Sequence, residues 1–87
     1  MNSYKLSIIT PRGKIFDGDV ESLQAPGTEG SFGVLFKHAP MITTLKPGVI
    51  EIKKNNSTQK FSISAGILEV EKNSHVLVLA NQAEEVT

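Results

Sequence analysis

The stretch Val-Ile-Glu-Ile-Lys-Lys-Asn-Asn-Ser-Thr-Gln-Lys-Phe-Ser-Ile-Ser, residues 49–64, has the pattern of a β-hairpin. Ile50 and Ile52 alternate with charged side chains, and further on Phe61 and Ile63 alternate with polar ones. An alternation of period two places the apolar side chains of a strand on one face. The polar Asn-Asn-Ser segment between the two runs is a candidate hairpin loop. We therefore predict two strands, 49–54 and 58–64, that share one buried face.

The same period recurs along the rest of the chain, between turn signals every six to twelve residues, among them a turn predicted at Pro26-Gly27. Further strands are predicted at residues 4–8, 14–17, 19–25, 31–35, 41–45, 68–71 and 76–80. Gly18 is expected to separate the strand 14–17 from the strand 19–25. The almost entirely apolar run 76–80 predicts a strand covered on both faces. Residues 81–87 are polar and acidic and are expected to fray, being too short for a stable isolated helix. No long window has helical periodicity, so the fold class is all-β, a sandwich or barrel.

Composition limits the function classes. A chain of 87 residues predicts one domain, and nine basic residues balance nine acidic ones. This balance argues against a nucleic-acid or anionic-membrane binder driven by charge. The absence of cysteine favours a reducing compartment. No apolar run is long enough for a signal peptide or a bilayer span.

Residues 27–40 form the one irregular stretch, with glycines at 27, 30 and 33 and an apolar patch between and after them. The spacing lacks the features of a phosphate-binding loop, and no helix is predicted after it. Phe32 and Phe36 are either core side chains or interface anchors. With Lys37 and His38 they also permit a stacking platform for single-stranded nucleic acid, which the neutral overall charge disfavours.

The sequence contains no catalytic constellation. The only histidines, His38 and His75, are far apart in the sequence, and neither has a cysteine or a paired carboxylate motif beside it. We interpret His75 as a surface residue at a strand end and His38 as the better candidate for contacting a partner. No nucleophile-elbow pattern is present. The residues taken alone therefore point to a small interaction module without catalytic, cofactor or metal sites.

The ordered set of motifs resembles the N-terminal domain of the ε subunit of F-type ATP synthases. The resemblance covers almost the whole chain and is carried by residues 4–9 (YKLSII), 16–18 (FDG), 26–35 (PGTEGSFGVL), 38–43 (HAPMIT), 45–50 (LKPGVI), 65–70 (AGILEV) and 76–80 (VLVLA). It implies a flattened β-sandwich of about ten short strands. It also implies a non-catalytic subunit of the rotating central stalk, with the γ subunit and the polar loops of the membrane c-ring as partners and no nucleic acid.

The resemblance also implies which residues face each partner. The c-ring-facing residues would be Glu29, Gly30, Ser31, Phe32 and His38. The γ-facing edge would be formed by Thr10, Met41, Ile42 and Thr43. Family members often carry an acidic residue at the position of Ser31, so one charge contact with the ring is missing here. The implied location is the cytoplasmic side of a bacterial inner membrane, as a peripheral protein.

The end of the chain departs from the family pattern. Most members continue into a two-helix C-terminal domain, whereas here an ε-type domain at residues 1–80 is followed by a short polar tail, 81–87. We expect no C-terminal helical hairpin, and therefore coupling of γ to the ring without inhibition by extended helices. An excised domain is the alternative explanation.

Overall fold

The structure, a computed structural model, describes residues 2–86 and contains ten strands and no helix within them. The strands are β1 (Tyr4–Thr10), β2 (Gly13–Val20), β3 (Ser22–Gly27), β4 (Gly30–Leu35), β5 (Met41–Leu45), β6 (Gly48–Lys54), β7 (Ser57–Ile63), β8 (Gly66–Val70), β9 (Val76–Ala80) and β10 (Ala83–Val86). The all-β prediction is confirmed. Met1 and Thr87, the outer ends of the predicted domain and tail, lie outside the described residues.

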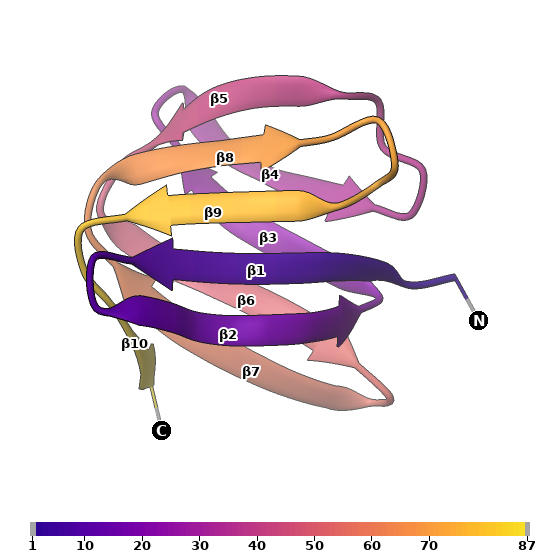
Figure 1. Ribbon diagram of the computed structural model, residues 1–87, viewed down its shortest axis with the longest axis horizontal. Coiled ribbons are helices and arrows are strands. Elements are labelled where there is room, and N and C mark those ends of the chain that lie inside the picture. Colours follow the sequence, from indigo (N-terminus) through magenta and orange to yellow (C-terminus); the bar gives the residue numbers. More distant parts are fainter. Residues whose placement is uncertain (1, 87) are drawn as a thin grey trace.

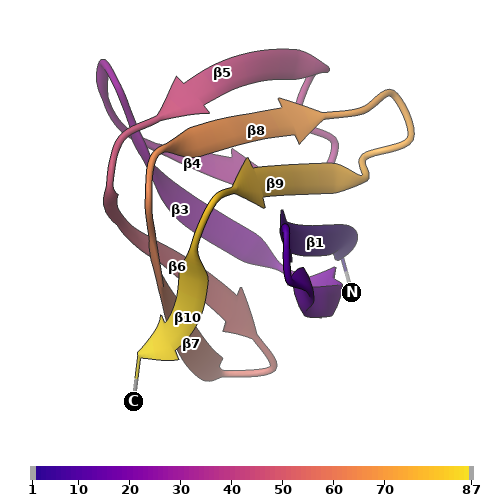
Figure 2. The ribbon, with the colours of Figure 1, turned by 60° about the vertical axis from the view of Figure 1, so that its left-hand side comes forward.

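The strands form two layers that face each other (Figures 1 and 2). One path of pairing runs β10-β7-β6-β3-β5-β8-β9-β1-β2, and β4 pairs with the other edge of β3. The front layer of Figure 1 is β5-β8-β9-β1-β2, and the back layer is β4-β3-β6-β7-β10. Only two residues separate β5 from β6, β7 from β8, and β9 from β10. At each of these corners the chain passes from one layer into the other, which confirms the sandwich.

The predicted hairpin is present, and the side chains predicted to be buried lie on its inner face. Ile50 is paired with Phe61, and both are buried between the layers. Asn55 and Asn56 have φ values of 51° and 65° and form a two-residue turn. Positive φ at both central residues is the geometry that matches the twist of hairpin strands, and asparagine tolerates it. Local sequence therefore determines this part of the fold.

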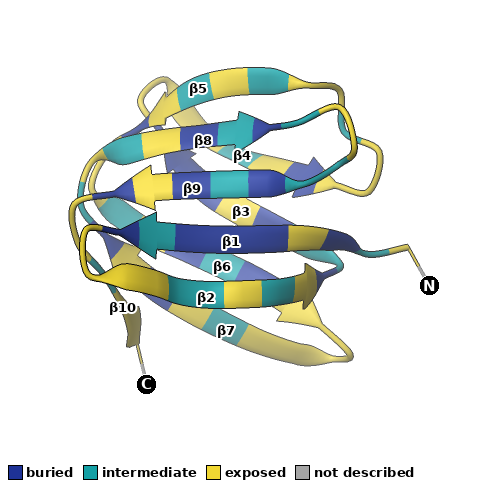
Figure 3. Cartoon of the chain, in the orientation of Figure 1, coloured by how far each residue is buried: buried dark blue, intermediate teal, exposed yellow. Residues whose placement is uncertain are grey.

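The core lies between the inner faces of the two layers, as Figure 3 shows by the alternation of buried and exposed residues along most strands. The fully buried side chains come from both layers and include Leu6, Ile8, Leu23, Val34, Ile50, Ile52, Phe61, Leu68, Val76 and Val78. Phe61 is the largest of them, and its ring meets the edge of Phe16 at a centroid distance of 5.7 Å. An edge-to-face pair adds to the stabilisation from area burial alone.

Gly66 is required where the chain turns from β7 into β8. It pairs with Ala80, and a Cβ atom at Gly66 would collide with the carbonyl oxygen of Leu79. That oxygen belongs to the neighbouring strand's backbone, so the contact cannot be relieved by rotating a side chain.

We expect Gly66→Ala to lower the free energy of unfolding by about 2–3 kcal/mol, the cost of overpacking a close backbone contact. Urea denaturation measures this directly. Gly18→Ala is the matched control, because its Cβ would meet only the Phe16 ring at 3.6 Å, and it should change stability by less than about 1 kcal/mol. Equal effects of the two substitutions would contradict the assigned role of Gly66.

Tyr4 connects the two layers at the opposite end of the core. Its side chain is buried, and its hydroxyl donates a 2.7 Å hydrogen bond to the carbonyl oxygen of Val34 in β4. Burial raises the pKa of Tyr4 well above its ordinary value. The folded protein therefore holds this phenol in its neutral form.

We expect stability to fall as the pH rises above about 10, the ordinary tyrosine pKa, because the unfolded chain then ionises while the folded chain does not. Tyr4 is the only tyrosine and the chain has no tryptophan, so tyrosinate absorbance reports on this residue alone. In Tyr4→Phe this alkaline loss should be absent. Ionisation of Tyr4 near pH 10 in a protein that stays folded would contradict the prediction.

Three local expectations were wrong. Gly18 does not break a strand, because it pairs with Leu6 inside the continuous ladder of β1 and β2, and the break falls at Glu21. The strand 76–80 is not covered on both faces, since the side chain of Leu79 is 46% exposed. The turn after β3 lies at Thr28 and Glu29 rather than at Pro26-Gly27, which belong to β3.

The expectation that residues 81–87 fray was also wrong over most of that segment. Residues Ala83–Val86 form β10, which pairs antiparallel with β7. At the corner before β10, the backbone N–H of Ser64 donates to the carbonyl oxygen of Gln82, and the N–H of Gln82 donates to Ser64 Oγ, both at 3.0 Å. Long-range pairing with β7 thus orders a segment whose own sequence is polar.

Candidate interaction surfaces

The outer face of the front layer carries exposed aliphatic side chains on neighbouring strands. Thr44 of β5 is paired with Ile67 of β8, Ile67 with Leu79 of β9, and Leu79 with Ile9 of β1. Residues directly opposite each other point to the same face of a sheet, so these four form one row across four strands. Ile42, two residues before Thr44, lies on the same face and is 70% exposed. We call Ile9, Ile42, Ile67 and Leu79 the apolar outer face.

Two shallow depressions in this face meet at Ile67. One is lined by Ile9, Thr10, Pro11, Ala65, Gly66, Ile67, Leu79, Ala80 and Asn81. The other is lined by Thr28, Glu29, Ile42, Thr43, Thr44 and Ile67. Glu29 is the only charged residue among these linings, and it lies at the rim of the second. A contiguous exposed apolar surface of this kind marks a protein interface more often than a solvated face.

The outer face of the back layer is different in character. Its exposed or half-buried side chains include Gln24, Glu51, Lys53 and Lys60, and Lys60 forms a 3.8 Å ion pair with Glu51. Val49 and Val86 are exposed on the same side and line a depression with Gln24, Glu51 and Lys60. Since the charges interrupt the aliphatic groups, this face has the mixed composition of ordinary protein surface.

The structure brings together part of the predicted γ-facing set. Ile42 points outward. Thr43 and Thr10 each line one of the two depressions at Ile67, but Thr43 is half-buried opposite the buried Leu68 and Thr10 is only 7% exposed. Met41 is half-buried and packs against the core, so it offers little surface to a partner. The pattern missed Ile67 and Leu79, whose outward direction depends on which face of their strands is buried.

The predicted c-ring-facing set is divided between the two ends of β4. Glu29 lies in the turn before β4, Gly30, Ser31 and Phe32 are its first three residues, and His38 follows its far end. Six residues of strand extend over roughly 17 Å. His38 is also engaged locally, because its backbone N–H donates to Leu35 and its Nδ1 lies 2.7 Å from the carbonyl oxygen of Ala39.

The two phenylalanines of the 27–40 stretch have different roles. Phe32 is half-buried and packs against the core, with its ring close to Gly27, where a Cβ would come within 2.9 Å of it. Phe36 is exposed in the loop after β4, and Lys37 Nζ lies 5.6 Å from the centre of its ring. Packing against the core therefore accounts for much of the reason a phenylalanine stands at position 32. Of the two, only Phe36 is exposed as a surface aromatic.

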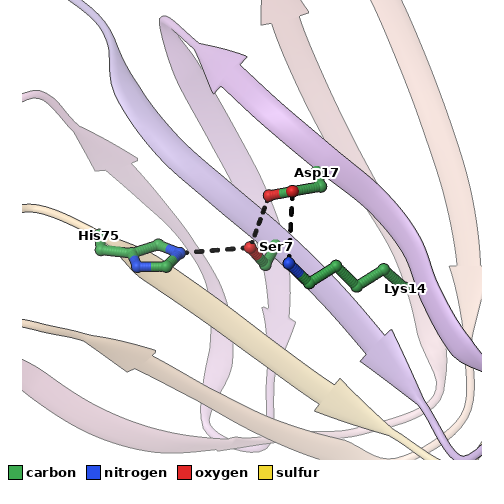
Figure 4. A network of polar contacts seen from close by, with 4 residues as sticks. All are labelled: Ser7, Lys14, Asp17 and His75. Atoms are coloured by element: carbon green, nitrogen blue, oxygen red, sulfur yellow. Dashed lines mark hydrogen bonds and ion pairs between the residues drawn. The ribbon is translucent and has the colours of Figure 1, made fainter.

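A polar network on β1, β2 and the approach to β9 was not predicted from the sequence (Figure 4). Ser7 Oγ donates to Asp17 at 2.9 Å and lies 3.2 Å from His75 Nε2. Lys14 Nζ is 3.4 Å from the other oxygen of Asp17, and His75 Nδ1 is 3.4 Å from Glu71. His75 thus has one carboxylate neighbour, Glu71, although no paired carboxylate motif stands beside it in the sequence.

The serine, histidine and glutamate have the connectivity of a hydrolase triad but not its chemistry. A nucleophilic serine must give its proton to the histidine. Here the single hydroxyl proton of Ser7 is directed at Asp17, and Ser7 is only 2% exposed. No substrate can reach it, so the network connects β1, β2 and the loop before β9 rather than catalysing a reaction. In residues 2–86 no group of three His, Cys, Asp or Glu side chains is placed to hold a metal ion.

The hydrogen bond from Ser7 is the largest cause lowering the pKa of Asp17; desolvation opposes it and Lys14 adds to it. Because the pKa of Asp17 is lower in the folded state, Asp17 stabilises the fold at pH values above its unfolded-state pKa of about 3.9. This stabilisation is lost as the pH falls through the folded-state pKa. We expect Ser7→Ala to raise the pKa of Asp17, measured by carbon-detected NMR titration. The exposed serine change Ser62→Ala should leave it unaltered. An unchanged Asp17 pKa in Ser7→Ala would contradict this explanation.

The comparisons with known proteins agree on one family. Residues 3–86 match the model of the ATP synthase delta/epsilon chain β-sandwich domain. The ATP synthase epsilon chain of Pelotomaculum thermopropionicum is 49% identical over 80 residues, 92% of this chain and 59% of that protein. The epsilon chain of Aliarcobacter butzleri is 45% identical over all 87 residues and 69% of that protein.

Two solved structures share the fold. A chain of the Euglena gracilis mitochondrial ATP synthase OSCP/F1/c-ring structure superposes with a TM-score of 0.91 at 22% identity, over 98% of this chain and 54% of that one. A chain of the Tetrahymena thermophila mitochondrial ATP synthase central stalk/c-ring structure superposes with a TM-score of 0.79 at 16% identity. The match covers 92% of this chain and 64% of that one. The chain spans about three fifths of the length of the first curated relatives it matches. No helix within residues 2–86 has the length and hydropathy to cross a bilayer. The chain belongs to the family of ATP synthase delta/epsilon chain β-sandwich domains.

Proposed function

We propose that this domain is part of the central stalk of a proton-translocating F-type ATP synthase, where it couples the γ subunit to the membrane c-ring without catalysing a reaction itself. The observation that carries the proposal is the apolar outer face, four aliphatic side chains on four strands with Glu69 opposite Ile42 at its border, in a domain from the ATP synthase epsilon family. In water such a row is unfavourable, and a partner that covers it gains the burial energy.

Within this proposal the γ subunit occupies the apolar outer face. Thr10, Ile42 and Thr43, which the family resemblance assigns to γ, line the two depressions that meet at Ile67. The polar loops of the c-ring would then contact the turn between β3 and β4, at Glu29, Gly30 and Ser31, all of which are exposed. His38 would join the same contact only if the ring also reached the far end of β4.

A coupling element must resist shear between its two partners. Each strand on the path from β2 to β10 is hydrogen-bonded to the next one. The two layers are also connected through the buried core between them. A close-packed interior has low compressibility and transmits strain. The proposed location is the cytoplasmic side of a bacterial inner membrane, held there through the complex, in keeping with the bacterial relatives.

Co-elution with the γ subunit from the same source on a sizing column tests the proposal. We expect a stable one-to-one complex that forms at micromolar concentrations. The isolated chain with an unrelated protein of the size of γ provides the control. Elution of the two subunits as separate species at every concentration would contradict the proposal that this domain binds γ.

A further inference from the structure

Strand β4 has one unpaired edge. It pairs with β3 and with no other described strand. Pro26 has no N–H, and its carbonyl oxygen accepts from Lys46 on the opposite side, so the Pro26–Ser31 pair exchanges no backbone hydrogen bonds. In an antiparallel ladder hydrogen-bonded and non-bonded pairs alternate. The backbone N–H and C=O groups of Ser31 and Gly33 therefore point away from β3, and both residues are exposed.

This edge lacks the protection that the edges formed by β2 and β10 carry. Edge strands are usually defended by charged side chains, proline or shortness. β2 carries Lys14, Asp17 and Asp19, and β10 is only four residues long with two glutamates. β4 reads Gly-Ser-Phe-Gly-Val-Leu and has neither a charge nor a proline. An undefended edge of six residues is typical of a strand that a partner covers in the working assembly.

We propose that an extended segment of the γ subunit adds to the free edge of β4 as a further strand of the back layer. The inference rests on the proposed function. β4 and β5 lie along the same side of the sandwich (Figures 1 and 2), so a subunit that covers Ile42 and Thr43 of β5 can continue onto β4. The edge carries no charge, so an added strand would not have to desolvate ionic groups. Gly33 has no side chain, which leaves room for close approach of another backbone beside the exposed Leu35.

The edge can be blocked without altering the pairing with β3. Gly33→Pro removes only the outward N–H of Gly33 and places the ring where the added strand would lie. A Cβ at this position meets only the carbonyl oxygen of Leu23 at an ordinary 3.6 Å. Gly33→Ala is the matched control, because it introduces the same Cβ and keeps the N–H.

We expect the Kd for purified γ to rise at least tenfold in Gly33→Pro and to stay within twofold of the wild type in Gly33→Ala, with both variants folded by circular dichroism. Wild-type affinity in folded Gly33→Pro would overturn the strand-addition inference and leave the proposed function intact. Failure of the wild-type chain to bind γ would overturn both, so the two failures are distinguishable.

Amide hydrogen exchange of the wild-type chain keeps the inference testable if Gly33→Pro does not fold. We expect the amides of Ser31 and Gly33 to exchange at least tenfold more slowly when γ is bound. Unchanged exchange at both amides in the complex would overturn the inference. Protection that grows with the concentration of the isolated chain would assign the edge to a second copy of this chain and would also overturn it.

Discussion

Replacing Phe61 with alanine is expected to lower the free energy of unfolding by about 3–5 kcal/mol. Phe61 is the largest fully buried side chain, it lies between the layers on β7, and it packs against the edge of Phe16. The substitution removes its buried apolar area and leaves a cavity that strands fixed by ladders on both sides cannot close. Because marginal stability is typical of a domain this small, much of the protein should be unfolded near its normal working temperature.

Urea denaturation followed by far-ultraviolet circular dichroism measures the loss. Phe36→Ala is the matched control, since it removes the same side chain from an exposed loop. It should cost less than about 1 kcal/mol. Similar losses for the two variants would mean that the core is not organised around Phe61.

Replacing Ile67 with aspartate is expected to weaken binding of γ at least about 100-fold, which corresponds to about 2.7 kcal/mol. Ile67 lies where the two depressions of the apolar outer face meet. Complex formation would bury the new carboxylate against aliphatic side chains without a partner charge, and such burial is strongly unfavourable. The free protein should remain folded, because Ile67 is already 44% exposed.

Val49→Asp provides a matched control for this prediction. Val49 is a similar aliphatic residue, 48% exposed, on the outer face of the back layer. Its substitution by aspartate should change the Kd for γ by less than about threefold, within the range of a surface change outside an interface. A large loss in Val49→Asp with none in Ile67→Asp would place the γ contact on the back layer.

The parts of the fold that depend on neighbouring residues were predictable. The hairpin of β6 and β7 follows from alternation around Ile50, Ile52, Phe61 and Ile63, together with two asparagines that accept positive φ. The family resemblance supplied the sandwich and the number of strands. Both predictions succeed because the residues that specify these features lie close together in short segments of the sequence.

The parts that depend on distant residues were not predictable. β10 is a strand because β7 offers it a ladder, and nothing in its four residues requires one. Leu79 belongs to an apolar run that has the pattern of a doubly covered strand, yet no described strand or loop covers its outer side. The partners of Ser7 lie 10 and 68 residues away in the chain, so no local pattern could connect Ser7 with His75.

The candidate site was predicted only in part for the same reason. Ile42 was placed on the γ-facing edge with the family resemblance, whereas Ile67 and Leu79 join it on one face through the pairing of β5, β8 and β9. Glu29 and His38 come from two neighbouring motifs that the resemblance assigns to one partner, and they lie at opposite ends of β4. Motifs read along the sequence therefore name residues at both ends of β4 and leave out Ile67 and Leu79 of the apolar outer face.

The most direct test of the central claim is methyl NMR of the isoleucine, leucine and valine side chains, recorded with and without the γ subunit. We expect the methyl signals of Ile42, Ile67 and Leu79 to shift or broaden on binding, while those of Val49 and Val86 on the back layer stay unchanged. Perturbation of Val49 and Val86 with no change at Ile67 and Leu79 would show that the apolar outer face is not where γ binds.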